Sequence, residues 1–161
     1  MRILAILAMI TTSALAQGAL PGNSDLDFLC RVRPAAFSNV DAHPVATAEI
    51  ADIWLLPTSA SVGLPYKLLA TVLPTGAHLP QVAPGLYGVI GNTVTVIGTG
   101  NAIYPSQSLM PWFGEIFTCP VWPAWLQGYT VHFQILSWAT SPAGAPFSTS
   151  HVLACATVPD D

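Results

Sequence analysis

Proline and glycine divide this sequence into short segments, and that spacing limits the chain to a fold built from short elements. The 161 residues include 15 prolines and 12 glycines, spread along the whole length. Proline cannot continue a helix or a central strand, and glycine favours turns. Helical periodicity is weak after residue 16, so the pattern favours strands bounded by turns.

Several of the segments between these residues have the composition of β-strands. In the clearest one, residues 129–139, apolar residues alternate with polar ones: Val131, Phe133 and Ile135 against Thr130, His132 and Gln134. We expect further strands at residues 45–56, 67–73, 86–90, 93–97, 115–119 and 148–158. In the last of these, Val152, Ala154, Ala156 and Val158 share one face. A helix is the alternative at 46–56, because this segment is rich in alanine. Ile50, Ile53 and Trp54 suit a buried strand, so we favour a strand there.

This arrangement predicts an all-β fold, namely an antiparallel immunoglobulin-like β-sandwich of about seven or eight strands. The competing fold, a parallel sheet with crossover helices, requires amphipathic helices of about ten or more residues between strands. The sequence offers no such segments.

The first 16 residues have the features of a secretory signal peptide. Arg2 precedes an unbroken apolar run at residues 3–10, and Ala14 and Ala16 have the small-residue spacing of a cleavage site. The run is shorter than the roughly 20 residues that span a bilayer. We therefore expect a signal-peptide helix at 1–16 and a single secreted domain at 17–161. This domain would be extracellular or periplasmic and would have no membrane span.

Charged residues are scarce and mostly acidic, which narrows the range of partners. They make up 7% of the chain, against about 25% in a typical soluble domain. Beyond residue 16 the only basic residues are Arg31, Arg33 and Lys67. This content argues against nucleic acid and anionic membranes as partners, because both need clustered positive charge. A surface this poor in charge suits a stable extracellular domain, or one that associates with itself or with an extracellular matrix or polysaccharide.

Three cysteines follow the expected signal peptide: Cys30, Cys119 and Cys155. An oxidising compartment favours one disulfide and leaves one thiol over. We expect a Cys119–Cys155 bond, because both residues fall in expected strands, although Cys30 could pair with either. The alternative is that all three thiols stay free and buried.

Sequence signatures of catalysis and of metal binding are absent. The four histidines lack zinc-motif spacing, and no Gly-x-Ser-x-Gly occurs. An enzyme would need Glu49, Asp52 or Glu115 in a cavity with His132 or His151. We expect no metal and no cofactor, and an enzyme is the less favoured hypothesis.

Aromatic residues are the strongest binding candidates. Tyr104, Trp112, Trp122 and Trp125 fall within a proline-rich irregular region, residues 104–125. Exposed rings can stack on sugars or anchor a protein partner, whereas buried rings would close the end of the core.

The C-terminal part resembles a known group of proteins. Residues 119–134 contain a proline-containing turn, then Leu126-Gln127-Gly128, then an aromatic strand ending in Gln134. This pattern, together with residues 147–158, resembles uncharacterised secreted β-sandwich domains of planctomycete-type bacteria. The resemblance implies the fold and an extracellular location, and it implies no catalytic residues. The sequence therefore favours a non-catalytic secreted protein with a structural, adhesive or surface-associated role, with a carbohydrate- or ligand-binding module as the alternative.

Overall fold

A computed structural model describes residues 20–89, 93–96, 108–110, 112 and 114–159. The expected signal peptide lies outside these residues, as does Tyr104. Within the described ranges, no helix has the length and apolar character needed to cross a membrane.

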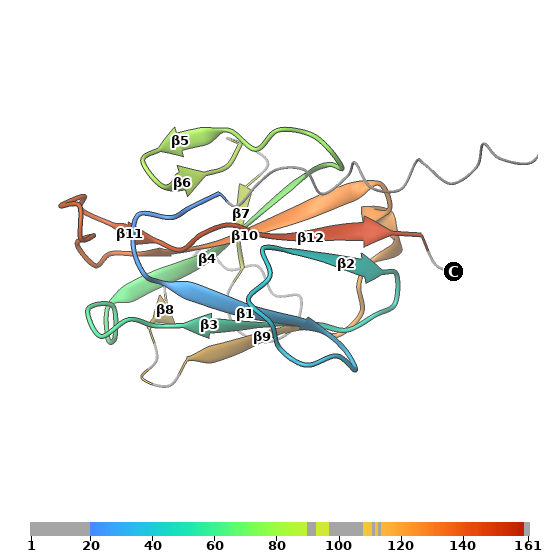
Figure 1. The fold of residues 1–161 in the computed structure, drawn as a ribbon, viewed down its shortest axis with the longest axis horizontal. Coiled ribbons are helices and arrows are strands. Elements are labelled where there is room, and N and C mark those ends of the chain that lie inside the picture. The colour runs from blue at the N-terminus through green and yellow to red at the C-terminus, as the bar shows by residue number, and fades with distance from the viewer. Residues whose placement is uncertain (1–19, 90–92, 97–107, 111, 113, 160–161) are drawn as a thin grey trace, which may run out of the picture.

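Strands dominate the structure and form two main sheets (Figure 1). The smaller sheet has the order β1-β3-β9 and is antiparallel: β1 (Asp27–Val32), β3 (Ala51–Leu56) and β9 (Glu115–Cys119). The larger has the order β2-β12-β10-β4-β7: β2 (Ala42–Ala46), β12 (Leu153–Val158), β10 (Tyr129–Ser137), β4 (Pro65–Pro74) and β7 (Thr93–Val96). The expected all-β class with antiparallel sheets is confirmed, with one exception, the parallel pairing of β2 with β12.

Short elements complete the architecture. In the larger sheet, β8 (Ser108–Leu109) pairs with β4, and β11 (Ser148–Thr149) pairs with β10. The strands β5 (Gln81–Ala83) and β6 (Leu86–Tyr87) form a separate hairpin, and the 3-10 turn η1 (Ala124–Leu126) lies between β9 and β10.

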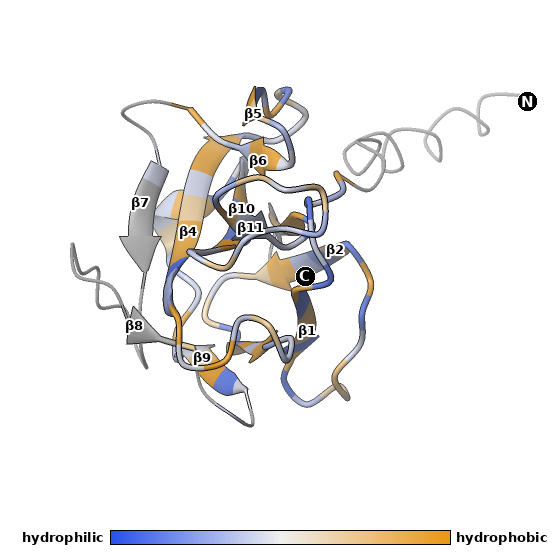
Figure 2. Ribbon diagram, turned by 90° about the vertical axis from the view of Figure 1, so that its left-hand side faces the viewer, coloured by the Kyte–Doolittle hydropathy of each residue, from blue (hydrophilic) through white to orange (hydrophobic). Residues whose placement is uncertain are grey.

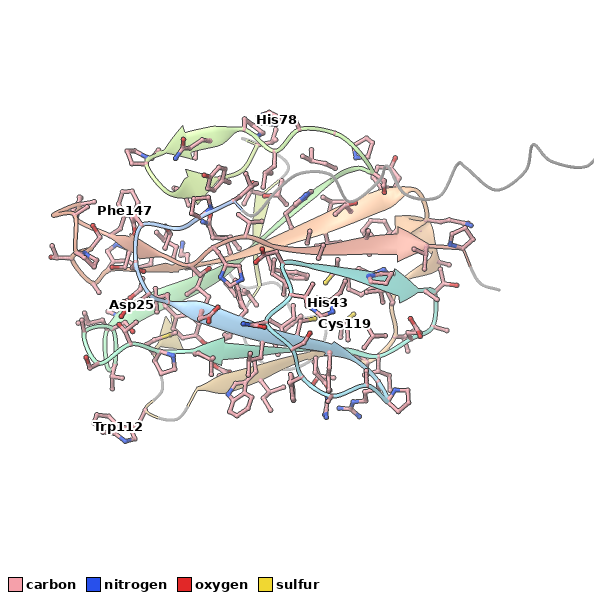
Figure 3. All side chains as sticks on the ribbon, in the orientation of Figure 1. Asp25, His43, His78, Trp112, Cys119 and Phe147 are labelled. Atoms are coloured by element: carbon pink, nitrogen blue, oxygen red, sulfur yellow. The ribbon has the colours of Figure 1, made fainter. Side chains whose placement is uncertain are left out.

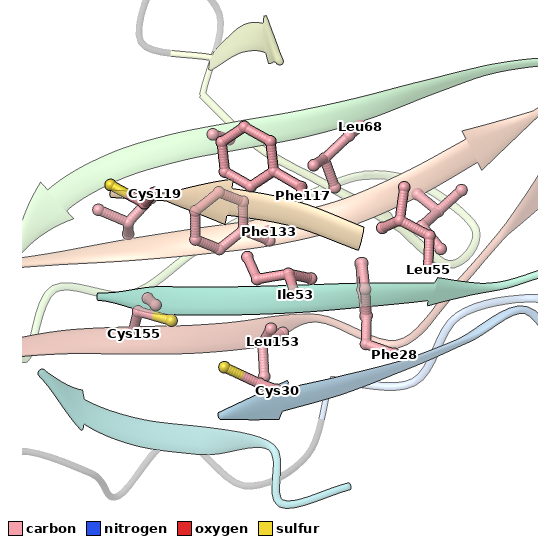
Figure 4. Packing of buried hydrophobic residues seen from close by; sticks show 14 of the residues in the cluster. Phe28, Cys30, Ile53, Leu55, Leu68, Phe117, Cys119, Phe133, Leu153 and Cys155 are labelled. Atoms are coloured by element: carbon pink, nitrogen blue, oxygen red, sulfur yellow. The ribbon is translucent and has the colours of Figure 1, made fainter. Parts of the chain in front are cut away.

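The core lies between the two main sheets. Alternation along each strand directs one set of side chains inward. From the smaller sheet these include Phe28, Ile53, Leu55 and Phe117, and from the larger sheet Leu68, Val131, Phe133, Ile135 and Leu153 (Figure 4). The rings of Phe117 and Phe133 meet across the interface with centroids 6.3 Å apart. The apolar face predicted for residues 129–139 is therefore the inner face of β10.

A third layer covers the other face of the larger sheet. The β5–β6 hairpin and its flanking residues lie on the side opposite β9 (Figure 2). There the Gln134 side chain, which is buried, donates to the carbonyls of Gly85 and Ser150 and accepts from the Tyr87 N–H. Gly85 adopts φ +74° at the hairpin turn, and a Cβ there would lie 2.6 Å from the Asn23 nitrogen. Gln134 thus fixes the hairpin to the sheet.

Two expected strands are each divided into separate strands in the structure. The segment 45–56 is neither one strand nor a helix, because a turn at Ala48 (φ +64°) separates β2 from β3. The Glu49 carboxylate accepts from the Ala46 N–H and stabilises this turn. In the segment 148–158, β12 begins at Leu153, and it is Leu153 and Cys155 that enter the core between the sheets.

We predict that Gln134→Leu destabilises the protein by about 2–4 kcal/mol, because Ser150 O and Tyr87 N lose their buried partner. Urea unfolding measures the change. The matched control is Gln127→Leu, an exposed position that should change stability by less than about 0.5 kcal/mol. Equal urea midpoints for the two variants would contradict the role of Gln134.

Candidate functional site

The predicted aromatic residues separate into buried and exposed ones. Trp122 is buried, and its indole N–H donates to Thr157 Oγ1 at 2.8 Å. Its backbone also pairs with the turn between β2 and β3, through Trp122 N to Glu49 O and Ala48 N to Trp122 O. Trp122 is therefore part of the core and not of a binding surface, which corrects the prediction for this residue.

Trp112 and Trp125 are both exposed, with 71% and 69% of their surface accessible. Trp112 precedes β9 and lies at the periphery of the molecule (Figure 3), whereas Trp125 belongs to η1, which follows β9. The two rings thus lie at opposite ends of β9 and cannot form one stacking platform.

Trp125 lies in the loop between β9 and β10. Val121 in the same loop and Tyr129, the first residue of β10, are also exposed. We call these three residues the β9–β10 tip. Trp122 and Leu126, from the same loop, are buried in the core and attach the tip to it. Backbone hydrogen bonds hold its two ends, from Leu126 N to Pro123 O and from Thr75 N to Gly128 O. The tip is thus an apolar, aromatic projection on a fixed backbone.

The three mid-chain carboxylates each have a structural partner. Glu49 stabilises the turn after β2, and Glu115 accepts a hydrogen bond from the Tyr66 hydroxyl. Asp52 is fully buried on the outer face of the smaller sheet. Its Oδ2 accepts from Arg31 Nε at 2.6 Å and from Arg33 Nε at 2.8 Å. Its Oδ1 accepts from Arg33 Nη2 at 3.0 Å and from Thr118 Oγ1 at 2.8 Å.

The charge of Asp52 is strongly favoured by these contacts. Burial by itself raises the pKa of a carboxyl group, but the hydrogen bonds from Arg33, Arg31 and Thr118 outweigh burial and lower the pKa of Asp52 to about 2. This carboxylate therefore remains ionised and holds β1, β3, β9 and the chain after β1 together. It is a structural ion-pair centre.

The histidines are dispersed, and each has a different environment. His151 lies between two carboxylates, with Nδ1 3.2 Å from Asp27 Oδ1 and Nε2 3.7 Å from Asp41 Oδ1. It borders a groove of about 360 Å³ lined by Pro21, Gly22, Ser24, Asp25, Leu26 and Asp27. His132 lies on the outer face of the larger sheet, where burial lowers its pKa and Nδ1 has no hydrogen-bond partner among the described residues.

The predicted alternative of a catalytic group finds no support in these positions. The carboxylates that contact His151 are Asp27 and Asp41, and not Glu49, Asp52 or Glu115. Within the described part of the chain, no set of three or more His, Cys, Asp or Glu side chains is arranged to hold a metal ion.

All three cysteines are free and buried, so the structure does not show the expected Cys119–Cys155 disulfide. The Cys155 thiol instead lies close enough to Cys30 for each to shift the pKa of the other. The Cys119 Sγ donates to Val121 O at 3.5 Å. The sequence left open a pairing of Cys30 with either other cysteine, but β1 was not among the expected strands. The alternation of Phe28, Cys30 and Val32 in an apolar context was the available signal.

Comparisons with protein-family models, with curated proteins and with solved structures gave no match.

We predict an acid-dependent loss of stability that is specific to Asp52. Its pKa is lower in the folded protein than in the unfolded chain, so its contribution is complete above pH 5 and is lost as the pH falls toward 2. The contribution is about 2 kcal/mol. Urea unfolding at several pH values should show a flatter profile for Asp52→Asn. Asp25→Asn, at an exposed position, should keep the wild-type profile, and a wild-type profile for Asp52→Asn would refute the assignment.

Proposed function

We propose that this protein is a secreted, non-catalytic β-sandwich of the immunoglobulin-like kind, with a structural or adhesive role at an extracellular surface. The observation that carries the proposal is the β9–β10 tip, which presents Trp125 with 69% of its surface exposed on a fixed backbone. The partner would be a second copy of the chain or an extracellular polysaccharide.

The tip has the properties of an interaction surface. Large aromatic side chains dominate binding energy at interfaces, and a rigid backbone lowers the entropy lost when they bind. Buried Trp122 supplies that rigidity, since its N–H is bound to Thr157 and its backbone to residues 48 and 49. Trp122 thus fixes the backbone of the loop, and Trp125 is available to contact a partner.

The engagement of the carboxylates supports a non-catalytic role. A general acid or base needs a carboxyl group that can exchange protons with a substrate. Both oxygens of Asp52 are occupied by arginines and Thr118, and Glu49 and Glu115 bind a backbone N–H and a tyrosine hydroxyl. These groups stabilise turns and sheets.

The test compares Trp125→Ala with Trp112→Ala, which removes an equally exposed tryptophan from the other end of β9. Sedimentation velocity over a wide concentration range measures self-association. Pelleting with insoluble cellulose, chitin and peptidoglycan measures attachment to polysaccharide. We expect Trp125→Ala to weaken one of these interactions at least about tenfold and Trp112→Ala to leave it unchanged.

Unfolding of both variants in urea serves as the control, since exposed side chains should change stability by less than about 0.5 kcal/mol. A wild-type protein that stays monomeric and binds none of the three polysaccharides would refute the adhesive role. Equal effects of the two substitutions would refute the assignment to the tip.

A carbohydrate-binding module is the second candidate, and the exposed face of Trp125 favours it. A single ring on a fixed turn can stack on one sugar. Titration with soluble chito- and cello-oligosaccharides should then change tryptophan fluorescence in the wild type and in Trp112→Ala, but not in Trp125→Ala. Binding that persists in Trp125→Ala would exclude this candidate.

A further inference from the structure

Two cysteines from opposite sheets meet in the core. Cys30 on β1 and Cys155 on β12 are both fully buried, and their thiols are close enough for each to shift the pKa of the other. In Figure 4 the Cys30 sulfur is directed toward Cys155, whereas Cys119 lies farther from both side chains. The strands lie in different sheets, so no ladder of hydrogen bonds joins them.

A histidine completes this cluster. His43 on β2 lies opposite Cys155 in the strand register, and its imidazole is beside the Cys30 thiol. Its Nε2 atom is buried and makes no hydrogen bond with any described residue. An unpartnered buried nitrogen is costly, and it can accept a proton from a neighbouring thiol.

The cluster lies beneath the terminal strands of the two main sheets. β1 and β2 are terminal strands of their sheets. The chain between them closes this edge through paired hydrogen bonds of Cys30 with Ser38, N to O in both directions. Displacement of this connection would uncover Cys30 without opening the centre of either sheet.

We propose that Cys30 and Cys155 form a disulfide that joins the two sheets, that His43 accepts the proton of the Cys30 thiol, and that Cys119 stays a free thiol. A disulfide requires an S–S bond of about 2.05 Å and suitably placed Cβ atoms. Both cysteines are free in this structure, so bond formation requires side-chain rotation and a backbone shift that bring the two sulfur atoms together. The proposal is independent of the β9–β10 tip.

The oxidant is a small disulfide such as oxidised glutathione. The Cys30 thiolate attacks one of its sulfur atoms, which forms a mixed disulfide and releases one glutathione thiolate. Cys155 then loses its proton, attacks Cys30 Sγ and releases the second glutathione thiolate. Two protein thiols are oxidised, one external disulfide is reduced, and the two protons end on the two released glutathione molecules.

The electrostatics distinguish the three cysteines. The contact with Cys155 lowers the pKa of Cys30 to about 6, and His43 contributes to this shift. Burial and the nearby charge of Asp52 act in the opposite direction. The same contact raises the pKa of Cys155, to which burial and the proximity of Cys30 and Cys119 add. Burial also raises the pKa of Cys119, so this cysteine stays protonated at neutral pH. Cys30 is thus the attacking thiolate.

The experiment uses the folded full chain, reduced and then incubated with oxidised glutathione at pH 7. Free thiols are alkylated in denaturant, and intact mass and non-reduced peptide maps identify the bonds. We expect one alkylated cysteine, Cys119, and a crosslinked peptide containing Cys30 and Cys155. Cys119→Ser should give the same bond, and reduction should lower the melting temperature by about 10 °C.

Three alkylated cysteines, a stable glutathione adduct, or a peptide linking Cys119 to either partner would overturn the pairing. The part assigned to His43 is tested by His43→Gln, with exposed His78→Gln as the matched control. We expect His43→Gln to slow oxidation about threefold at pH 7 and not at pH 9, where thiols ionise without help. Equal rates for the two variants at pH 7 would overturn the role of His43.

Discussion

The burial of β10 on both faces is the constraint on which the rest of the structure depends. Its inner face carries Val131, Phe133 and Ile135, which pack against the smaller sheet. Its outer face carries Thr130, His132 and Gln134, which are polar and yet buried. Buried polar groups need partners. The hairpin β5–β6 provides them for Gln134, and in return Gln134 holds the hairpin against the sheet.

Strand positions with strict alternation or flanking prolines were predictable from the sequence. The segment 115–119 coincides with β9, and 129–139 begins where β10 begins. β1 was not predicted because Asp27 and Arg31 interrupt its apolar residues. Arg31, like Arg33 just after the strand, has a tertiary partner, Asp52. The turn at Ala48 was not predicted either. It depends on a hydrogen bond from the Ala46 N–H to the Glu49 side chain, and a glutamate at this position is equally compatible with a helix or a strand.

The candidate site was partly predictable for a similar reason. The proline-rich region 104–125 marks where aromatic residues gather, but composition does not say which ring is buried. Trp122 is fixed by an acceptor 35 residues away, Thr157, and Cys30 and Cys155 come together because β1 and β12 face the same core from different sheets. Contacts between residues distant in sequence thus determine the burial of Trp122 and the proximity of the two cysteines. Local sequence patterns do not reveal such contacts.

The distribution of charge determines what kind of partner the tip can have. Beyond Arg2 the chain has three basic residues. Arg31 and Arg33 both bind Asp52, and the Lys67 ammonium lies 5.9 Å from the centre of the Trp138 ring. All three cations therefore have partners within the molecule, so long-range attraction to an anionic partner contributes little to association. The recognition proposed for the β9–β10 tip would then depend on short-range apolar and stacking contacts, and such contacts weaken little as salt increases.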